Sequence, residues 1–418
     1  MNIRKSIDDM CNRALNSRLN VGDYDIRQRN NMLKTLCLLI KQNQSDIIYH
    51  NQKDLVIANK KKLSSSFIDR MTLTPDRIKS MVNCIRHIIR LPDPLYKRTK
   101  AKKLENGIYL SQMRVPLGTI AIVYESRPNV TIDAACLCLK SGNSVILKGG
   151  SDTLNTNQYL VKLIERSLKK ECMNSDLVQL VKTTNRLALK YLLKKLDHID
   201  VVIPRGGKSL IEMIMKESKI PMIKHLDGNC HVFIDQDADH KIAFDVSLNS
   251  KVQRLGVCNA IETLLIHEKY SSKKSIEILT ALDDAGIEIR GCKKVKKIFS
   301  KTKIAKESDW YREYLGPVLA VKIIKSLDEA ISHISKYGSM HTDAIISRDK
   351  VSIKTFIQKV DSSSVMVNTS TRFADGFEYG LGAEIGISTD KLHARGPVGL
   401  VGLTNQKYIV TSKGKIRQ

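Results

Sequence analysis

The sequence lacks the patterns that would place a protein in a membrane or outside the cell. Its 418 residues contain no run of about 18 apolar residues, so we expect no membrane-spanning helix and no membrane partner. The first residues are charged from the start and do not have the pattern of a secretion signal. The nine cysteines are an odd number without a C-x-x-C pair, which argues against a disulfide framework or a zinc ribbon. These absences predict a cytoplasmic protein.

Aromatic residues are scarce, and this limits what the large positive charge can mean. The formal net charge is +26, and a basic surface attracts polyanions. The lysines are nevertheless spread along the whole chain, and only seven Phe and one Trp, beside thirteen Tyr, are available to stack on bases. A nucleic-acid-binding protein therefore stays as an alternative, but we expect no nucleic-acid partner. A solvated, lysine-rich surface that favours anionic substrates accounts for the same charge.

Recognisable metal-binding patterns are also missing. The sequence has no H-E-x-x-H motif and no cluster of carboxylates. His225, His231 and His393 are too widely separated along the chain to define a metal site. We therefore expect no catalytic metal.

The first hundred residues have the periodicity of helices. Apolar residues recur at three- and four-residue spacing from Arg4 to Leu19, and Met32–Ile40 and Ile78–Leu91 broadly repeat the pattern. Thr74 followed by Pro75 is typical of a helix N-cap with proline at the first helical position. We predict a helical region that ends near residue 100.

From residue 107 the pattern changes to strands that alternate with helices. Gly107–Arg114 has alternating character, which predicts an extended arm. Three nearly continuous apolar runs, Thr119–Tyr124, Ser144–Lys148 and His198–Ile203, predict strands buried on both faces. Glycine turns and helices follow these runs, so we expect an α/β fold with parallel strands and ligands at the carboxyl ends of these strands. A second α/β portion begins near Cys230.

Cys258 is the strongest candidate for a reactive side chain. We expect it on a turn exposed to a cleft, after a helix that covers about Ala243 to Arg254. The negative end of that helix dipole does not favour a thiolate, so nearby cations such as Lys251 or Arg254, or a bound cofactor, would have to activate it. The alternative is a small core residue, as we expect for most of the other cysteines.

Two further features could contribute to a site. Asn129 follows Pro128 at the start of a predicted helix, where its side-chain amide could stabilise an oxyanion or simply cap the helix. The turn Arg205-Gly206-Gly207-Lys208 resembles a phosphate cradle at a helix N-terminus. The turn matches neither G-x-G-x-x-G nor the P-loop pattern, and it could equally be a tight turn that needs glycine.

A set of motifs occurs in order along nearly the whole chain. The motifs are Val115-Pro-Leu-Gly118, Tyr124-Glu-Ser-Arg-Pro-Asn-Val130, Cys138–Gly150, Ile203-Pro-Arg-Gly-Gly207, Gly228-Asn-Cys-His231, Cys258-Asn-Ala-Ile-Glu-Thr263, Asp361-Ser-Ser-Ser364, Asn368–Gly376, Gly380–Glu384 and Lys391–Pro397. Together they resemble those of one family, the γ-glutamyl phosphate reductases of the aldehyde dehydrogenase superfamily.

The resemblance implies an aldehyde dehydrogenase-like architecture of three parts. These are a Rossmann-like cofactor domain (residues 1–104, 126–230 and 362–386), an α/β catalytic domain (231–361), and a small β flap used in oligomerisation (105–125 and 387–418). We therefore also expect a homo-oligomer.

The resemblance also implies roles for single residues. Cys258 would be the thiol nucleophile, and Asn129 would be the oxyanion-hole asparagine. The cofactor would be NADPH. Its adenosine ribose would contact Lys148, its pyrophosphate would lie near Arg205, Gly206 and Gly207, and its nicotinamide-side ribose would be held by Glu313. Arg254, Arg372, His393 and Arg395 are candidates for binding the anionic groups of the substrate, although surface roles are equally open for each.

The implied activity is the NADPH-dependent reduction of L-glutamyl 5-phosphate to L-glutamate 5-semialdehyde and phosphate through a cysteine thioester, the second step of proline biosynthesis. Ordinary aldehyde dehydrogenases have a water-activating glutamate in a Glu-Leu-Gly-Gly motif. This chain has His225-Leu-Asp-Gly228 instead, so a thioester should be reduced and not hydrolysed. The alternative is a dehydrogenase that oxidises a semialdehyde to the free acid. Glutamate 5-kinase would supply the acyl phosphate, and a transient contact with that enzyme is left open.

Overall fold

The computed structural model describes residues 2–18 and 24–417, and they form two compact units. Unit 1 comprises the described residues as far as Lys224, together with Gly380–Gly386 and the residues from Val398 onward. Unit 2 comprises His225–Tyr379 and Ile387–Pro397. In the ranges that the structure describes, no helix combines the length and the apolar character needed to cross a membrane.

Unit 1 begins with the helices that the sequence pattern predicts. Thr74 accepts a hydrogen bond from the backbone N–H of Arg77, and Pro75 opens the helix as expected. That helix buries one apolar face. The expected end of the first helix at Leu19 lies outside the described residues. The helices are α1 (Ile3–Arg18), α2 (Ile26–Gln42), α3 (Gln44–Lys60), α4 (Ser65–Met71) and α5 (Pro75–Arg90).

The core of unit 1 contains, within the described ranges, a parallel sheet of four strands in the order β5-β4-β3-β6. All residues of β3 are buried, as its continuous apolar run predicts. The sequence analysis missed β5, which is only three residues long. The elements are β3 (Thr119–Tyr124), α6 (Pro128–Lys140), β4 (Ser144–Lys148), η2 (Ser151–Thr153), α7 (Leu154–Lys170), η3 (Ser175–Leu177), β5 (Val178–Leu180), α8 (Arg186–Leu192), β6 (Val201–Arg205) and α9 (Lys208–Glu217).

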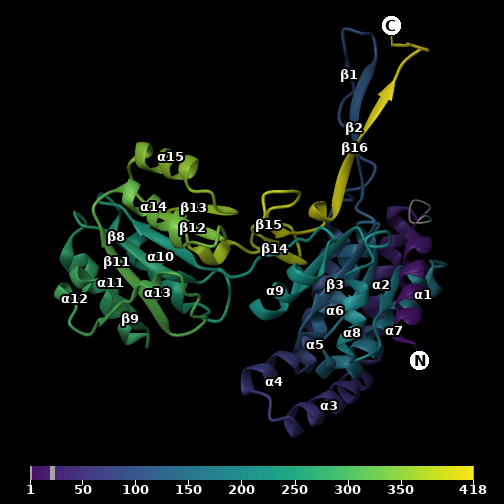
Figure 1. Cartoon of the computed structure of the whole chain (residues 1–418), viewed down its shortest axis with the longest axis horizontal. Helices are drawn as coiled ribbons and strands as arrows, with labels where there is room; N and C mark the ends of the chain where they lie inside the picture. The colour runs from purple at the N-terminus through teal and green to yellow at the C-terminus, as the bar shows by residue number, and fades with distance from the viewer. Residues whose placement is uncertain (1, 19–23, 418) are drawn as a thin grey trace. The chain divides into compact units, whose positions relative to one another are not determined.

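An antiparallel arm, drawn standing away from the helices of unit 1 in Figure 1, joins distant parts of the sequence. Its strands are β1 (Lys102–Lys103), β2 (Tyr109–Pro116) and β16 (Thr404–Thr411). β16 pairs with β2 along its whole length, from Thr404 opposite Pro116 to Thr411 opposite Tyr109. The extended arm was predicted, but the expected flap boundary at residue 125 is wrong. β3 pairs with β4 and β6, so it belongs to the central sheet of unit 1.

Unit 2 contains a parallel sheet of seven strands among the described residues, in the order β10-β9-β11-β8-β7-β12-β13. β13 pairs with β12, so residues 362–379 lie in this unit. This differs from the sequence analysis, which places residues 362–386 in the cofactor domain. The elements are β7 (Cys230–Ile234), α10 (His240–Val252), β8 (Ile261–His267), α11 (Ser272–Asp284), β9 (Glu288–Gly291), α12 (Lys293–Ile298), β10 (Lys303–Ile304), α13 (Glu307–Trp310), β11 (Val318–Ile324), α14 (Leu327–Tyr337), β12 (Thr342–Ile346), α15 (Lys350–Lys359), β13 (Ser364–Val367) and η4 (Thr371–Phe373).

The remaining short elements lie in the last forty or so residues, where the chain passes between the two units. They are β14 (Gly386–Ser388), β15 (Gly396–Val398) and η5 (Val401–Leu403), and β14 and β15 pair with each other.

Candidate active site

The candidate site residues of unit 2 lie at the amino ends of neighbouring parallel strands. Cys258 is in the turn before β8, His225 and Gly228 come before β7, and His341 comes directly before β12. These three strands are adjacent in the sheet, in the order β8-β7-β12. Because the strands are parallel, the segments that lead into them meet at one edge of the sheet. The chain order alone did not predict this convergence.

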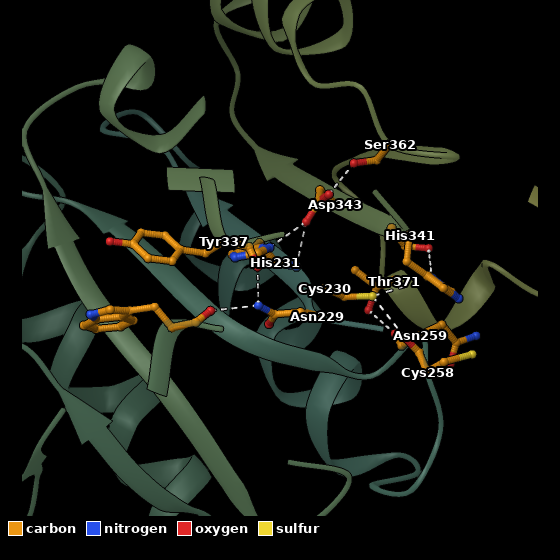
Figure 2. Close-up of polar contacts among 12 residues, drawn as sticks. Asn229, Cys230, His231, Cys258, Asn259, Tyr337, His341, Asp343, Ser362 and Thr371 are labelled. Atoms are coloured by element: carbon orange, nitrogen blue, oxygen red, sulfur yellow. Dashed lines mark hydrogen bonds and ion pairs between the residues drawn. The ribbon is translucent and has the colours of Figure 1, made fainter. Parts of the chain in front are cut away.

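The turn that carries Cys258 is fixed through its backbone. The Cys258 carbonyl accepts a hydrogen bond from Cys230 Sγ at 3.1 Å (Figure 2). A Cβ atom on Gly228 would lie 2.0 Å from the same carbonyl oxygen, so only glycine fits there. The Asn259 carbonyl accepts from Thr371 Oγ1 at 2.7 Å. Helix α10 ends at Val252, so Cys258 lies on a turn and is partly exposed, as predicted.

Lys251, one of the cations that could activate the thiol, is paired with a buried carboxylate. Its Nζ donates to Glu262 Oε2 at 2.6 Å, and both side chains are fully buried. Burial lowers the pKa of Lys251 and raises that of Glu262 to about 7. The other carboxylate oxygen of Glu262 accepts from the backbone N–H of Leu315 at 3.0 Å. The pair therefore ties the end of α10 and the start of β8 to the segment before β11.

Two of the predicted substrate-binding arginines lie close to the cysteine. Arg254 is exposed in the segment between α10 and Cys258, and Arg372 lies in η4. Burial and the neighbouring Arg254 charge lower the pKa of Arg372, while Cys258 opposes that shift. Arg372 Nε also donates to Gln253 Oε1 at 2.8 Å. The two arginines thus form a cationic rim beside the thiol.

The other two predicted substrate-binding residues belong to the segment between β14 and β15. Arg395 donates to the Asp361 carboxylate and to the Asp361 carbonyl, both at 2.8 Å. Lys391 also pairs with Asp361. Hydrogen bonds from the two cations lower the pKa of this carboxyl group, and the contribution of Lys391 is the larger. His393 has a left-handed backbone, with φ of 62°. Arg395 is therefore bound to Asp361. A substrate contact of His393 or of Arg395 stays a prediction.

Glu313 is tied to the segment that supports the cysteine. Its Oε1 accepts a hydrogen bond from the Gly228 N–H at 2.8 Å. Gly228 is the residue that packs on the Cys258 carbonyl, so Glu313 and Cys258 share one support. Sequence resemblance selected Glu313, but it did not indicate this contact.

The structure also brings two histidines to the thiol, a grouping that was not predicted. One ring nitrogen of His225, one of His341 and Cys258 Sγ all lie within 4.8 Å of one another. The two rings are T-shaped, with centroids 5.5 Å apart. His341 is buried, and burial lowers its pKa to about 3. His225, the first residue of the His225-Leu-Asp-Gly228 run, thus lies beside the cysteine.

Unit 1 has a cleft of about 500 Å³ at the carboxyl ends of its strands, whereas the site residues of unit 2 lie at the amino ends of theirs. Lys148, at the end of β4, lines this cleft, and its Nζ donates to the Gly149 carbonyl at 2.8 Å. Burial lowers the pKa of Lys148. Arg186 and Lys190, on α8, add two basic side chains to the lining. The sequence analysis missed them, because it did not find β5, which precedes α8.

The glycine turn at Arg205–Gly207 is already occupied by a carboxylate. The Gly207 N–H donates to Glu125 Oε2 at 2.8 Å, and the backbone N–H of Glu125 donates to the Arg205 carbonyl at 3.0 Å. A Cβ atom on Gly206 would lie 2.5 Å from Glu125 Oε2. Because that oxygen is the end of a flexible side chain that can shift, the contact does not by itself require glycine, but the Gly207 N–H does point at an anion.

Asn129 lies in the first turn of α6, and its side chain is exposed. Its Nδ2 donates to Asp133 Oδ2 at 3.1 Å. The N-cap position is Arg127, so the simple capping role for Asn129 is wrong. Burial raises the pKa of Asp133 to about 6. Asp133 holds the amide oriented on the first turn of the helix.

Comparisons with known proteins agree with this architecture. The model of the aldehyde dehydrogenase family matches residues 3–284. A γ-glutamyl phosphate reductase from Ruthia magnifica subsp. Calyptogena magnifica is 49% identical over 93% of this chain and 93% of its own length. One from Thermodesulfovibrio yellowstonii is 45% identical over the full length of both chains. The crystal structure of a γ-glutamyl phosphate reductase from Thermotoga maritima is 37% identical, with a TM-score of 0.96 over 99% of this chain and 100% of that one.

The predicted aldehyde dehydrogenase-like α/β fold and the predicted resemblance are both confirmed. The chain belongs to the aldehyde dehydrogenase family of nicotinamide-dependent oxidoreductases, in its γ-glutamyl phosphate reductase branch.

Proposed function

We propose that the protein reduces L-glutamyl 5-phosphate to L-glutamate 5-semialdehyde and phosphate with NADPH, through a thioester on Cys258. The observation that carries the proposal is the surroundings of that thiol. His225, and not a glutamate, lies beside Cys258, and Gly228 of the same motif packs on its carbonyl. At this position of the motif, therefore, no glutamate is available to direct water at an acyl group on Cys258.

In the proposed reaction the Cys258 thiolate attacks the acyl carbon of the substrate. A sulfur–carbon bond forms, and the phosphate leaves with the electron pair of the broken carbon–oxygen bond. The Asn129 amide stabilises the oxyanion, an interaction typically worth about 3–4 kcal/mol. NADPH, when bound, supplies a hydride. Cys258 then releases the semialdehyde and regains its thiolate.

The cleft of unit 1 fits a phosphate-bearing dinucleotide. It offers the amine of Lys148, the hydroxyl groups of Thr184 and Ser209, and the basic side chains of Arg186 and Lys190. Lys148 would contact the adenosine ribose, and the two basic residues of α8 favour NADPH, with its additional phosphate, over NADH. Arg205, Gly206 and Gly207 would lie near the pyrophosphate, where Glu125 now accepts a hydrogen bond. Glu313 would hold the nicotinamide-side ribose.

The substrate carries a carboxylate and a phosphate, and unit 2 offers cations near the thiol. Arg254 and Arg372 are the best placed of the four candidates, because Arg372 interacts electrostatically with both Arg254 and Cys258. His393 and Arg395 would act only if the substrate reached the segment that Asp361 now holds.

The arm of unit 1 supports a homo-oligomer. Tyr408 and Val410, two residues apart on β16, are 66% and 54% exposed. An edge strand with such side chains is suited to pair with another copy. A place in proline biosynthesis, a cytoplasmic location and a transient contact with glutamate 5-kinase stay predictions.

The reverse reaction tests the function. Semialdehyde and NADP⁺ should give NADPH only when phosphate or arsenate is present. The reason is that the acyl group must be transferred from Cys258 to one of these anions before the enzyme can turn over again. NADP⁺ reduction that does not depend on the anion would instead support the second candidate, oxidation to the free acid. Cys258→Ala separates an enzymatic signal from a background reaction, since it should remove turnover in both cases.

A further inference from the structure

We propose that His225, Cys258 and His341 form a binding site for a thiophilic divalent cation, with Zn²⁺ as the best match, and that the bound cation blocks the thiol. One donor atom from each side chain lies within 4.8 Å of the other two. Zn²⁺ binds thiolate sulfur at about 2.3 Å and imidazole nitrogen at about 2.0–2.1 Å. Small rotations of three side chains therefore suffice to bring all three donors to one ion.

His341 provides an observation that is independent of this spacing. Its side chain is 1% exposed, and its Nε2 has no hydrogen-bond partner. A buried polar atom without a partner costs free energy unless something binds it. In Figure 2 the ring extends from the start of β12 toward the turn of Cys258, with Nδ1 hydrogen-bonded to Thr342 Oγ1 at 2.9 Å. The second nitrogen is thus the one directed toward the proposed site.

His225 is oriented in the way that a metal-binding histidine usually is. Its Nδ1 lies 3.0 Å from the Ile387 carbonyl, which fixes the N–H on that nitrogen. Nε2 then carries the lone pair that can coordinate. A backbone carbonyl bonded to the far nitrogen is a common second interaction in protein metal sites.

The helix dipoles at this sheet edge favour a cation, and they act against the positive charges of Arg254 and Arg372 beside the thiol. Helices α10 and α14 both run toward this edge and end in the segments before β8 and β12. The carboxyl end of a helix carries a partial negative charge, which stabilises a positive ion. Two imidazoles and one thiolate would leave a fourth position of a tetrahedral ion for water.

The chemistry of binding explains the block. Binding forms a sulfur–zinc bond and releases the thiol proton to solvent, so one proton appears for each ion bound. The sulfur lone pair that would attack the acyl carbon is then held by the metal. No redox change is involved. The binding part of the proposal stands by itself, whereas the inhibition rests on the proposed function of Cys258.

Zn²⁺ alone, added to the full-length metal-free protein, tests the binding. We expect one tight ion per chain by calorimetry, with release of a proton, and a sulfur-to-metal charge-transfer band when Co²⁺ replaces Zn²⁺. Cys258→Ser should abolish the band, and His341→Gln or His225→Gln should weaken binding at least about tenfold. Cys292→Ser and His240→Gln, elsewhere in unit 2, are matched controls that should bind normally. Thermal unfolding checks that each variant is folded.

Three results would overturn the proposal. The first is that the parent protein does not bind Zn²⁺. The second is that folded His341→Gln and His225→Gln bind Zn²⁺ as tightly as the parent. The third is that the two control variants lose as much Zn²⁺ affinity as the histidine variants. In the reverse assay, Zn²⁺ should inhibit the parent and EDTA should restore it. If the protein binds Zn²⁺ as described but shows no semialdehyde oxidation with NADP⁺ at all, the proposed function fails and the metal site stands.

Discussion

The two parallel sheets of this chain use opposite edges. In unit 1 the cleft lies where the strands end and the following helices begin, so helix N-termini point toward it. In unit 2 the thiol and the two histidines lie where the strands begin and the preceding helices end. The first edge has a partial positive charge and suits the phosphates of a dinucleotide. The second has a partial negative charge, so its chemistry depends on individual side chains.

This difference shows which residues each unit has to supply. The helix N-termini at the edge of unit 1 favour a bound anion. The Glu125 carboxylate already accepts a hydrogen bond from the Gly207 N–H there. At the edge of unit 2 a thiolate is opposed by the dipole of α10, and the charges of Arg372, an electrostatic neighbour of Cys258, and of the adjacent Arg254 act against that dipole. Single substitutions should therefore have large effects in unit 2 and graded effects in unit 1.

The largest effect is expected from Cys258→Ala. Turnover should fall by at least roughly 10⁴-fold, because the covalent route is lost. NADPH binding, measured by fluorescence, should change little, since the cleft proposed for the cofactor belongs to unit 1. Cys292→Ser, in the same unit, is the control and should keep normal turnover. Retention of near-normal turnover by Cys258→Ala would remove the cysteine from the mechanism.

Gly228→Ala should have the next largest effect. The added Cβ would lie 2.0 Å from the Cys258 carbonyl oxygen, so the turn must move. We expect turnover to fall about 10²-fold or more, in line with the cost of displacing a reacting group by about 1 Å. Stability should fall by about 1–3 kcal/mol, as for other overpacked sites.

Gly256→Ala is the matched control for this substitution. Gly256 lies two residues before the cysteine, and the nearest atom to its added Cβ would be the Leu315 carbonyl oxygen at 3.9 Å. This variant should retain most of the turnover and stability of the parent. Equal losses in both variants would mean that any side chain in this part of the site is harmful, and the close approach of Gly228 would not be the cause.

Lys148→Ala tests the contrasting edge in unit 1. Loss of one charge-assisted contact should raise the Kd for NADPH about tenfold, which corresponds to about 1.4 kcal/mol. Turnover at saturating NADPH should stay close to normal, because the thiol is untouched. Lys182→Ala, an exposed lysine of unit 1 outside the cleft lining, should change neither value. A fall in turnover with an unchanged Kd would contradict the division of tasks between the units.

Local sequence patterns predicted the fold where burial is continuous. Thr119–Tyr124 is apolar throughout because β3 is buried on both faces, and that is visible in the sequence. Val178–Leu180 is too short, and its central glutamine interrupts the pattern, so β5 was missed and Arg186 and Lys190 with it. The boundary of the arm was misplaced because strand pairing, and not local pattern, decides to which sheet β3 belongs.

The candidate site was predictable only as far as motifs reach. The motifs of the chain selected Cys258 and marked His225 as a departure from related dehydrogenases. They did not select His341, because its proximity to Cys258 depends on the strand order β8-β7-β12, and local periodicity carries no information about strand order. The Lys251–Glu262 pair was missed for a related reason: a lysine in a helix looks solvated until the structure shows it buried.

Glu125→Gln should have the smallest effect and tests the anion preference of the unit 1 edge directly. Glutamine can keep the hydrogen bond from the Gly207 N–H, but it removes the negative charge from the turn. If the pyrophosphate binds near this turn, NADPH should bind severalfold more tightly, and the gain should shrink as salt screens the remaining charges. Glu212→Gln, an exposed glutamate on α9, is the control and should have almost no effect. Weaker NADPH binding by Glu125→Gln would instead mean that the carboxylate orders the turn for the cofactor. The anion preference of this edge would then come from α8 and Lys148 and not from the glycine turn.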